Sequence, residues 1–190
     1  CEVAPAIIFY NVYESNSTSS AGAIVELVDG SINNVNGSYV AKIFKEGTDK
    51  KLHKYDGAFY SKQSMIVDGN GTLNINAANE GLDSEMHLTI NGGNINIVSQ
   101  NDGINVNEDE ESIFTMNDGN LRIASGYGEE GDGIDSNGSL IINGGTIIAQ
   151  AYAFSADAGI DSDMGIHING GTVIASGNML DRISESNQTY

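Results

Sequence analysis

Residues 132–150 read "DGIDSNGSLIINGGTIIAQ", and residues 158–176 read "AGIDSDMGIHINGGTVIAS". The two stretches are nearly identical, and they carry Asp, Gly and Asn at the same offsets, 26 residues apart. Repetition of a whole unit at a fixed period is typical of solenoids and other repeat architectures. We therefore interpret each copy as one coil of a stacked structure.

Two anchors trace this repeat along the chain. The first is a turn that follows an apolar pair, and its polar residue recurs at Asp68, Asn91, Asn117, Asn143 and Asn169. The second is a step of the form acidic-x-apolar-Asp/Asn, which we read in the segments that begin at Asp56, Glu80, Asp102, Asp132 and Ala158. Five copies of both anchors in one order make the repeat secure.

Each period contains three short strand-like pieces: a "GID" step, an "LTI"-type strand and an "INIV"-type strand after the Asn-Gly turn. Stacked coils pair each strand with its equivalent in the next coil, about 4.8 Å away. The alternation of apolar and polar residues at Leu88–Ile90 and Leu140–Ile142 turns one face inward. We predict an all-β, single-stranded, right-handed parallel β-helix with coils of about 22–30 residues.

The recurring asparagines Asn91, Asn117, Asn143 and Asn169 fit a stacked ladder in which each amide bonds to the next and satisfies buried polar groups. We expect a single domain over residues 1–190. It comprises irregular N-terminal coils at 1–55 with "APAIIFYN" among them, regular coils at 56–178 and a C-terminal tail at 179–190.

The composition excludes several classes of function. The net charge is -18, from 26 acidic and 8 basic residues, so the surface repels nucleic acid and anionic membranes. The single cysteine, Cys1, excludes an intrachain disulfide, and no transmembrane segment is present. Without a start Met or a signal peptide, the chain reads as processed or trimmed.

Stacking gathers the acids of the second anchor into a column. Carboxylates on neighbouring coils, about 5 Å apart, repel one another unless they are neutralised. Ca²⁺ does this well, since it takes six to eight oxygen ligands with flexible geometry. We predict more than one Ca²⁺ between coils, with the alternative that the acids simply face solvent. The ligands would be Glu80, Asp83, Asp102, Asn105, Asp132, Asp135, Asp157 and Asp161.

The repeats "NEGLDSEMHLTINGGNINIVSQNDGINV" and "GDGIDSNGSLIINGGTIIAQ" resemble a bacterial family of secreted carbohydrate-binding β-helix domains, long described only as a domain of unknown function. The likeness is clear over residues 56–178. That family is similar to polysaccharide lyase family 9 pectate lyases, which bind calcium through a D-D-G-x-D type cluster. The resemblance implies plant cell-wall ligands: acidic pectic polymers such as polygalacturonate, and also cellulose. The chain departs from the lyase pattern because no copy has two consecutive acids before Gly.

Binding without cleavage and catalysis are separate predictions. A lyase needs Ca²⁺ and a basic group that removes a proton, and here only Lys62 and Arg122 are candidates. The lysines cluster between residues 42 and 62 and none follows the acidic column. We therefore favour calcium-dependent binding, in which Ca²⁺ bridges the protein to the polymer and Tyr127, Tyr152 and Tyr60 stack against sugar rings.

A third possibility is a cell-surface stalk that calcium only makes rigid. The insertions at 107–112 and 125–131 bear on this, because loops gathered on one face often build a binding surface. If they lie beside the acids, binding is favoured, and if they lie on the opposite face, the stalk gains. The resemblance implies a secreted or bacterial cell-surface location.

Overall fold

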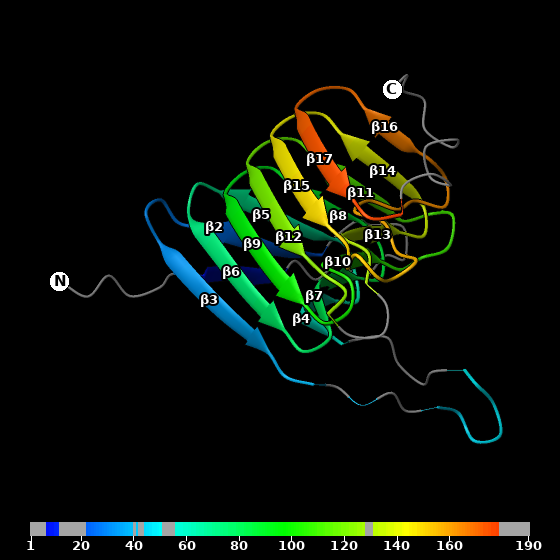
Figure 1. The fold of residues 1–190 in the computed structure, drawn as a ribbon. Helices are drawn as coiled ribbons and strands as arrows, with labels where there is room; N and C mark the ends of the chain where they lie inside the picture. The colour runs from blue at the N-terminus through cyan, green and yellow to red at the C-terminus, as the bar shows by residue number, and fades with distance from the viewer. Residues whose placement is uncertain are drawn as a thin grey trace.

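The computed structural model describes residues 7–11, 22–39, 41, 44–50, 56–127 and 131–178. All regular secondary structure in these residues is β-strand, and the strands form three sheets that run along the axis of a β-solenoid (Figure 1). The prediction of an all-β parallel β-helix is therefore confirmed. Among the described residues, no helix is long and apolar enough to cross a membrane.

The three sheets differ in length. The seven-stranded sheet comprises β1 (Ile7–Asn11), β2 (Ala23–Leu27), β5 (Met65–Gly69), β8 (Leu88–Ile90), β11 (Ile113–Met116), β14 (Ser139–Ile142) and β16 (Ile166–Ile168). The six-stranded sheet comprises β3 (Ile32–Gly37), β6 (Thr72–Ala77), β9 (Asn94–Ser99), β12 (Asn120–Ala124), β15 (Thr146–Gln150) and β17 (Thr172–Ser176). The four-stranded sheet comprises β4 (Gly57–Ser61), β7 (Glu80–Ser84), β10 (Ile104–Val106) and β13 (Ile134–Ser136).

Strands pair in parallel with their equivalents in the next coil, as the sequence period requires. Leu121 of β12 pairs with Ile95 of β9 and with Ile147 of β15. In the seven-stranded sheet, Phe114 pairs with Leu88 and Leu140 in the same way. Each of the four coils from β4 to β15 therefore contributes one strand to every sheet before the chain rises by one strand spacing.

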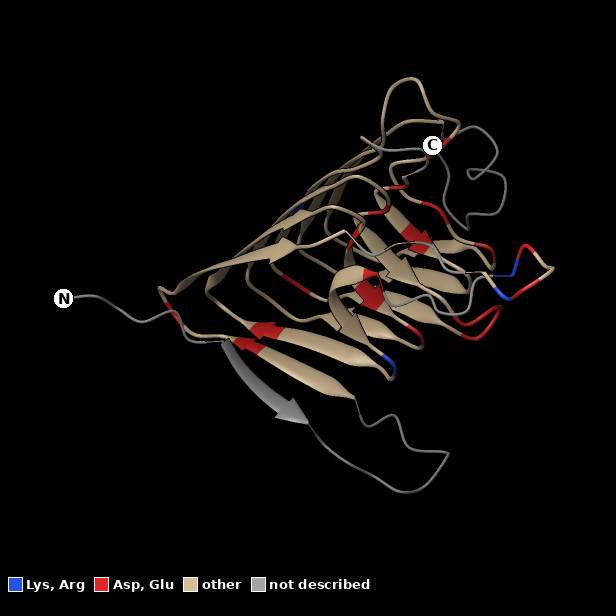
Figure 2. Cartoon of the chain, turned by 90° about the horizontal axis from the view of Figure 1, so that it is seen from below, with Lys and Arg blue, Asp and Glu red and all other residues tan. Residues whose placement is uncertain are grey.

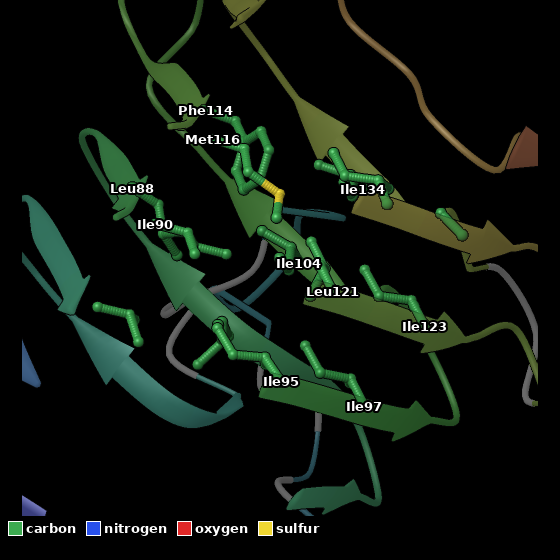
Figure 3. Packing of buried hydrophobic residues seen from close by; sticks show 14 of the residues in the cluster. Leu88, Ile90, Ile95, Ile97, Ile104, Phe114, Met116, Leu121, Ile123 and Ile134 are labelled. Carbon is green, nitrogen blue, oxygen red and sulfur yellow. The ribbon is translucent and has the colours of Figure 1, made fainter. Parts of the chain in front are cut away.

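The core is a set of stacked apolar columns that fill the solenoid from end to end. Leu88, Phe114 and Leu140 are fully buried in one column, and Ile95 and Leu121 are fully buried in another. Figure 3 shows the side chains from the three sheets pointing toward one another. Because successive strand residues point to opposite faces, the residues that alternate with these buried ones face the surface.

The asparagine ladder forms as predicted. Asn117 Nδ2 donates to Asn91 Oδ1, Asn143 to Asn117 and Asn169 to Asn143, each at 2.8 Å. The ladder lies at the surface, whereas we expected it to satisfy buried groups. Two residues after each asparagine, a glycine adopts a positive φ, 97° at Gly119, which a side chain would strain.

The N-terminal strand corrects one prediction. Residues 4–11 were interpreted as an earlier coil, but β1 pairs antiparallel with β2. It therefore adds an edge strand to the seven-stranded sheet where a further parallel coil was expected, and it covers hydrogen-bonding groups of β2 that would otherwise stay unpaired. The predicted tail at 179–190 lies outside the described residues.

Candidate cation and carbohydrate site

The four-stranded sheet places the predicted acids in two columns. Asp83, Asn105 and Asp135 are register partners on β7, β10 and β13. The other column consists of Glu80, the first residue of β7, and of Asp102 and Asp132, which precede β10 and β13. Gly81 N donates to Asp102 O, and Gly103 N donates to Asp132 O. Figure 2 shows acidic segments, in red, on strands and loops of the solenoid. The backbone pairing thus stacks the predicted acids on neighbouring coils, with the exception of Asp157.

Close stacking explains the glycine of each "DGID" step. A Cβ on Gly103 would lie 2.6 Å from Gly133 O, and a Cβ on Gly133 would lie 2.2 Å from Gly159 O. Neither glycine has a positive φ. Glycine is therefore required here because neighbouring coils approach too closely for any side chain.

The carboxylates gather into two clusters within the described part of the chain. One oxygen each of Asp132, Asp135 and Asp161 lie within 4.8 Å of one another, and the first two side chains are partly exposed. This set is called the open cluster below. A second set, the closed cluster, is Asp56, Glu80 and Asp83, which meets the same distance limit and is buried throughout. Either arrangement of oxygen ligands can hold a metal ion.

The closed cluster contains a residue that we did not predict as a ligand. In the sequence, Asp56 was aligned with Glu80, but the structure pairs Gly57 with Glu80 and Tyr60 with Asp83. The alignment was therefore wrong by one residue, and Asp56 precedes the column. It still reaches Glu80 and Asp83. The Asp56-Gly57 pair resembles the acid-Gly pairs of the later coils, but the sequence alone did not reveal that it is shifted by one residue.

Asp102 and Asn105 lie on the coil between the two clusters. Asn105 Nδ2 donates to Glu80 Oε1 at 3.2 Å, and Asp132 N donates to Asp102 Oδ1 at 2.7 Å. These two predicted ligands therefore link the clusters by hydrogen bonds.

Asp157 is the predicted ligand that departs from the column. Its Oδ2 accepts a hydrogen bond from Gly131 N at 2.8 Å, and Ala158, the next residue, occupies the column position. The carboxylate of Asp157 still acts on Asp132 through its charge. Asp157 therefore lies next to the open cluster and is not one of its three members.

Burial and repulsion act strongly on the two central acids. Burial raises the pKa of Asp102 well above its ordinary value, and Glu80, Asp135 and Asp132 raise it further. Burial likewise raises the pKa of Asp132 to about 7, with repulsion from Asp135 and Asp161, although the hydrogen bond from Ala158 N lowers it. Burial and the neighbouring charges therefore both disfavour the ionised forms of these two acids.

Three aromatic side chains on loops near the open cluster, Tyr127, Tyr152 and Phe154, form a contiguous row that is called the aromatic strip below. The ring centroids of Tyr127 and Tyr152 lie 6.2 Å apart, and those of Tyr152 and Phe154 lie 5.6 Å apart. Phe154 is 88% exposed, and it was missed because it lies in the irregular segment "AYAFSAD". Tyr60 is separate from this strip: its hydroxyl donates to Glu85 Oε1 at 3.2 Å.

The strip and the open cluster are connected through short loops. Asp157 lies three residues after Phe154, and it bonds to Gly131, beside Asp132. A Cβ on Gly126 would touch both Tyr152 and Gly131, so the two loops pack closely. The aromatic rings therefore border the acidic sheet.

The two candidate bases lie apart from the open cluster. Arg122 is exposed on β12, in the six-stranded sheet, between the buried Leu121 and Ile123. Lys62 follows β4, which lies at the opposite edge of the four-stranded sheet from β13. Three strand spacings separate those edges, about 14 Å. Neither base is brought to Asp132, Asp135 and Asp161.

Both predicted insertions border the acids. Asn107 Nδ2 donates to Asp83 Oδ1 at 2.7 Å, and Asn137 Nδ2 donates to Asp109 Oδ1 at 3.0 Å. The segment that ends at Gly131 contacts Asp157. Of the two arrangements that we considered for the insertions, the structure has them beside the acids.

Comparison with known proteins identifies a family for this chain. No curated protein and no solved structure matches the chain. One family model, described as carbohydrate-binding domain-containing protein, matches residues 5–188, which is nearly the whole sequence. A β-solenoid with an exposed aromatic strip beside acidic clusters suits such a role. The chain belongs to this family of carbohydrate-binding domain-containing proteins.

Proposed function

We propose that the open cluster binds Ca²⁺ and that the ion joins the protein to an acidic polysaccharide of polygalacturonate type, without cleavage. The observation that carries this proposal is the meeting of three carboxylate oxygens within 4.8 Å at a partly exposed place. A closed ligand set could not admit a polymer. An open one leaves coordination positions that the carboxylates of a uronate polymer can fill.

The charge of the protein explains why a cation is needed. At a net charge of -18, the chain repels a polyanion directly. An ion held by Asp132, Asp135 and Asp161 neutralises their mutual repulsion, and its remaining coordination sites attract uronate oxygens. Ca²⁺ fits better than Zn²⁺, because the ligand atoms are carboxylate oxygens and the three histidines, His53, His87 and His167, show no ligand spacing in the sequence.

The aromatic strip supplies the second part of the binding surface. Tyr127 and Tyr152 are 55% and 40% exposed, and Phe154 extends their line. Flat apolar rings exposed side by side offer sugar rings a stacking surface, while the tyrosine hydroxyls offer hydrogen bonds. Because the strip borders the acidic sheet, one extended polymer could contact both. Tyr60, half-buried and bonded to Glu85, has a smaller part in this proposal.

The positions of the bases support binding over β-elimination. A lyase requires a base within hydrogen-bonding reach of the proton that it removes. Arg122 belongs to another sheet, and Lys62 lies at the coil of the closed cluster. The alternative, a lyase that uses Lys62, predicts unsaturated product. The stalk alternative predicts that no polymer binds.

A second face favours a neutral polymer such as cellulose. The strands of the six-stranded sheet contain no acidic residue in a chain that has 26 of them. One column on this face starts at Ile32 and continues through Thr72, Asn94, Asn120, Thr146 and Thr172. Five strand spacings give a face about 24 Å long, with rows of amides and hydroxyls that can bond to an extended glucan.

We further infer a secreted or cell-surface location, since plant cell-wall polymers lie outside cells.

Calcium-dependent polymer binding is tested by retardation of the protein in gels that contain polygalacturonate, with Ca²⁺ or with a chelator, alongside absorbance of unsaturated product. We expect retardation only with Ca²⁺ and no absorbance. Asp161→Asn should abolish the retardation, and Asp68→Asn, the same charge change on β5 in another sheet, should not.

The aromatic strip and the neutral face need separate variants. Tyr152→Ala and Phe154→Ala should weaken polygalacturonate binding and leave Ca²⁺ binding unchanged. Thr146→Lys on the acid-free face should weaken binding to microcrystalline cellulose, while Thr115→Lys on β11 should not. Calcium-independent retardation by polygalacturonate, or equal effects of Asp161→Asn and Asp68→Asn, would contradict the main proposal.

A further inference from the structure

The closed cluster differs from the open one in its access to solvent. The side chains of Asp56, Glu80 and Asp83 are 7%, 6% and 0% exposed. The open cluster, by contrast, has two partly exposed members. Groups that are buried this deeply cannot contact a polymer, so the closed cluster needs a different explanation.

The closed cluster and the neighbouring Asn105 contain buried oxygens that accept no hydrogen bond. Asp56 Oδ1 is buried and accepts no hydrogen bond. The neighbouring Asn105 donates its amide to Glu80, and its own Oδ1 is also buried without a hydrogen bond. An unsatisfied buried oxygen is costly, and three carboxylates within 4.8 Å add repulsion to that cost. A bound cation removes both penalties.

We propose that the closed cluster is a structural site for a divalent, oxygen-preferring cation, which fastens β4 to β7. Asp56 lies directly before β4, and Glu80 and Asp83 lie within β7. Among the described strands, β4 lies at the edge of its sheet and pairs with β7 alone. The ion adds bonds at the point where pairing begins, at Gly57 and Glu80.

This role is independent of the polymer. The two clusters divide the work, because the closed one stabilises the coil at β4 and the open one is available to a ligand. The closed site thus goes beyond the proposed function, and either can fail without the other. Ca²⁺ alone is a sufficient probe for it.

The experiment compares Asp56→Asn with Asp161→Asn and Asp68→Asn after all metal has been removed from the full chain. Calorimetric titration counts the Ca²⁺ ions bound, and thermal unfolding measures the rise in Tm that Ca²⁺ causes. Asp56→Asn should bind one ion fewer and lose more than half of that rise, yet still be retarded by polygalacturonate. Asp161→Asn should also lose an ion, keep most of the rise in Tm and lose retardation.

Hydrogen exchange on the wild-type protein gives a second measurement if Asp56→Asn fails to fold. Added Ca²⁺ should slow exchange at the amides of β4 by at least tenfold and leave β17, at the far end of the six-stranded sheet, unchanged. Equal ion counts and equal Tm rises in wild type and Asp56→Asn would overturn the proposal, and so would unchanged exchange in β4. If the ion counts, Tm rises and exchange in β4 are as expected but neither wild type nor any variant binds polygalacturonate, only the proposed function is refuted.

Discussion

Asp132→Asn tests the electrostatic reasoning directly. In the metal-free protein the pKa of Asp132 is about 7, against an ordinary value of 3.8. The native state therefore binds this proton more tightly than the unfolded state does. Stability falls as pH rises from about 4 to about 7, because the native carboxyl must lose its proton against burial and repulsion.

The size of the effect follows from the two pKa values. Their difference, 7 less 3.8, corresponds to about 4 kcal/mol at roughly 1.4 kcal/mol per pH unit. The carboxylate is partly exposed, so solvent screening reduces the expected loss to about 2–4 kcal/mol. Asparagine keeps an oxygen that can accept the hydrogen bond from Ala158 N, and it cannot ionise.

Urea unfolding followed by circular dichroism, in chelator at pH 4 and pH 8, measures this. We expect Asp132→Asn to match wild type at pH 4 and to exceed it by about 2–4 kcal/mol at pH 8. Saturating Ca²⁺ should make wild type more stable than Asp132→Asn at pH 8, since the variant lacks one of the carboxylates that bind the ion. Asp68→Asn serves as the control for net charge. If Asp132→Asn and Asp68→Asn change stability equally at pH 8, the reasoning is refuted.

Three further predictions concern the solenoid itself. Leu121→Ala empties a fully buried position and should lower the free energy of unfolding by about 2–5 kcal/mol, measured by urea unfolding. Gly133→Ala places a Cβ 2.2 Å from Gly159 O, so the coils must separate; we expect lower Tm and fewer bound Ca²⁺ ions, and an unchanged ion count would contradict this. Asn143→Ala removes two ladder hydrogen bonds at the surface and should cost only about 1 kcal/mol, so a loss as large as that of Leu121→Ala would be unexpected.

The regular part of the fold was predictable because each coil repeats the same local instructions. The Asn-Gly turns, the apolar alternation and the 26-residue period all indicate one parallel stack. When consecutive units have equal lengths, register follows from the period, and Asp132, Asp135 and Asp161 fall together without further information. The same logic predicted the ladder of Asn117 and Asn143.

Register fails as a guide where unit lengths vary. Asn74 bonds to Asn34, 40 residues away, and to Asn96, 22 residues away. Here backbone pairing and core packing decide which residues align. As a result Gly57, and not Asp56, pairs with Glu80. The antiparallel pairing of β1 with β2 likewise depends on tertiary contacts, because a short apolar strand carries no sign of its direction.

The sequence by itself therefore determined the architecture, the acidic columns and the residue types that can hold cations. Only the tertiary structure decided that Asp56 joins Glu80 and Asp83, how deeply each acid is buried and which aromatic rings accompany them. Phe154 joins Tyr152 through the path of an irregular loop, and Asp56 reaches Asp83 through the stacking of coils. Burial and distance between residues far apart in sequence arise from packing, and no local pattern encodes them.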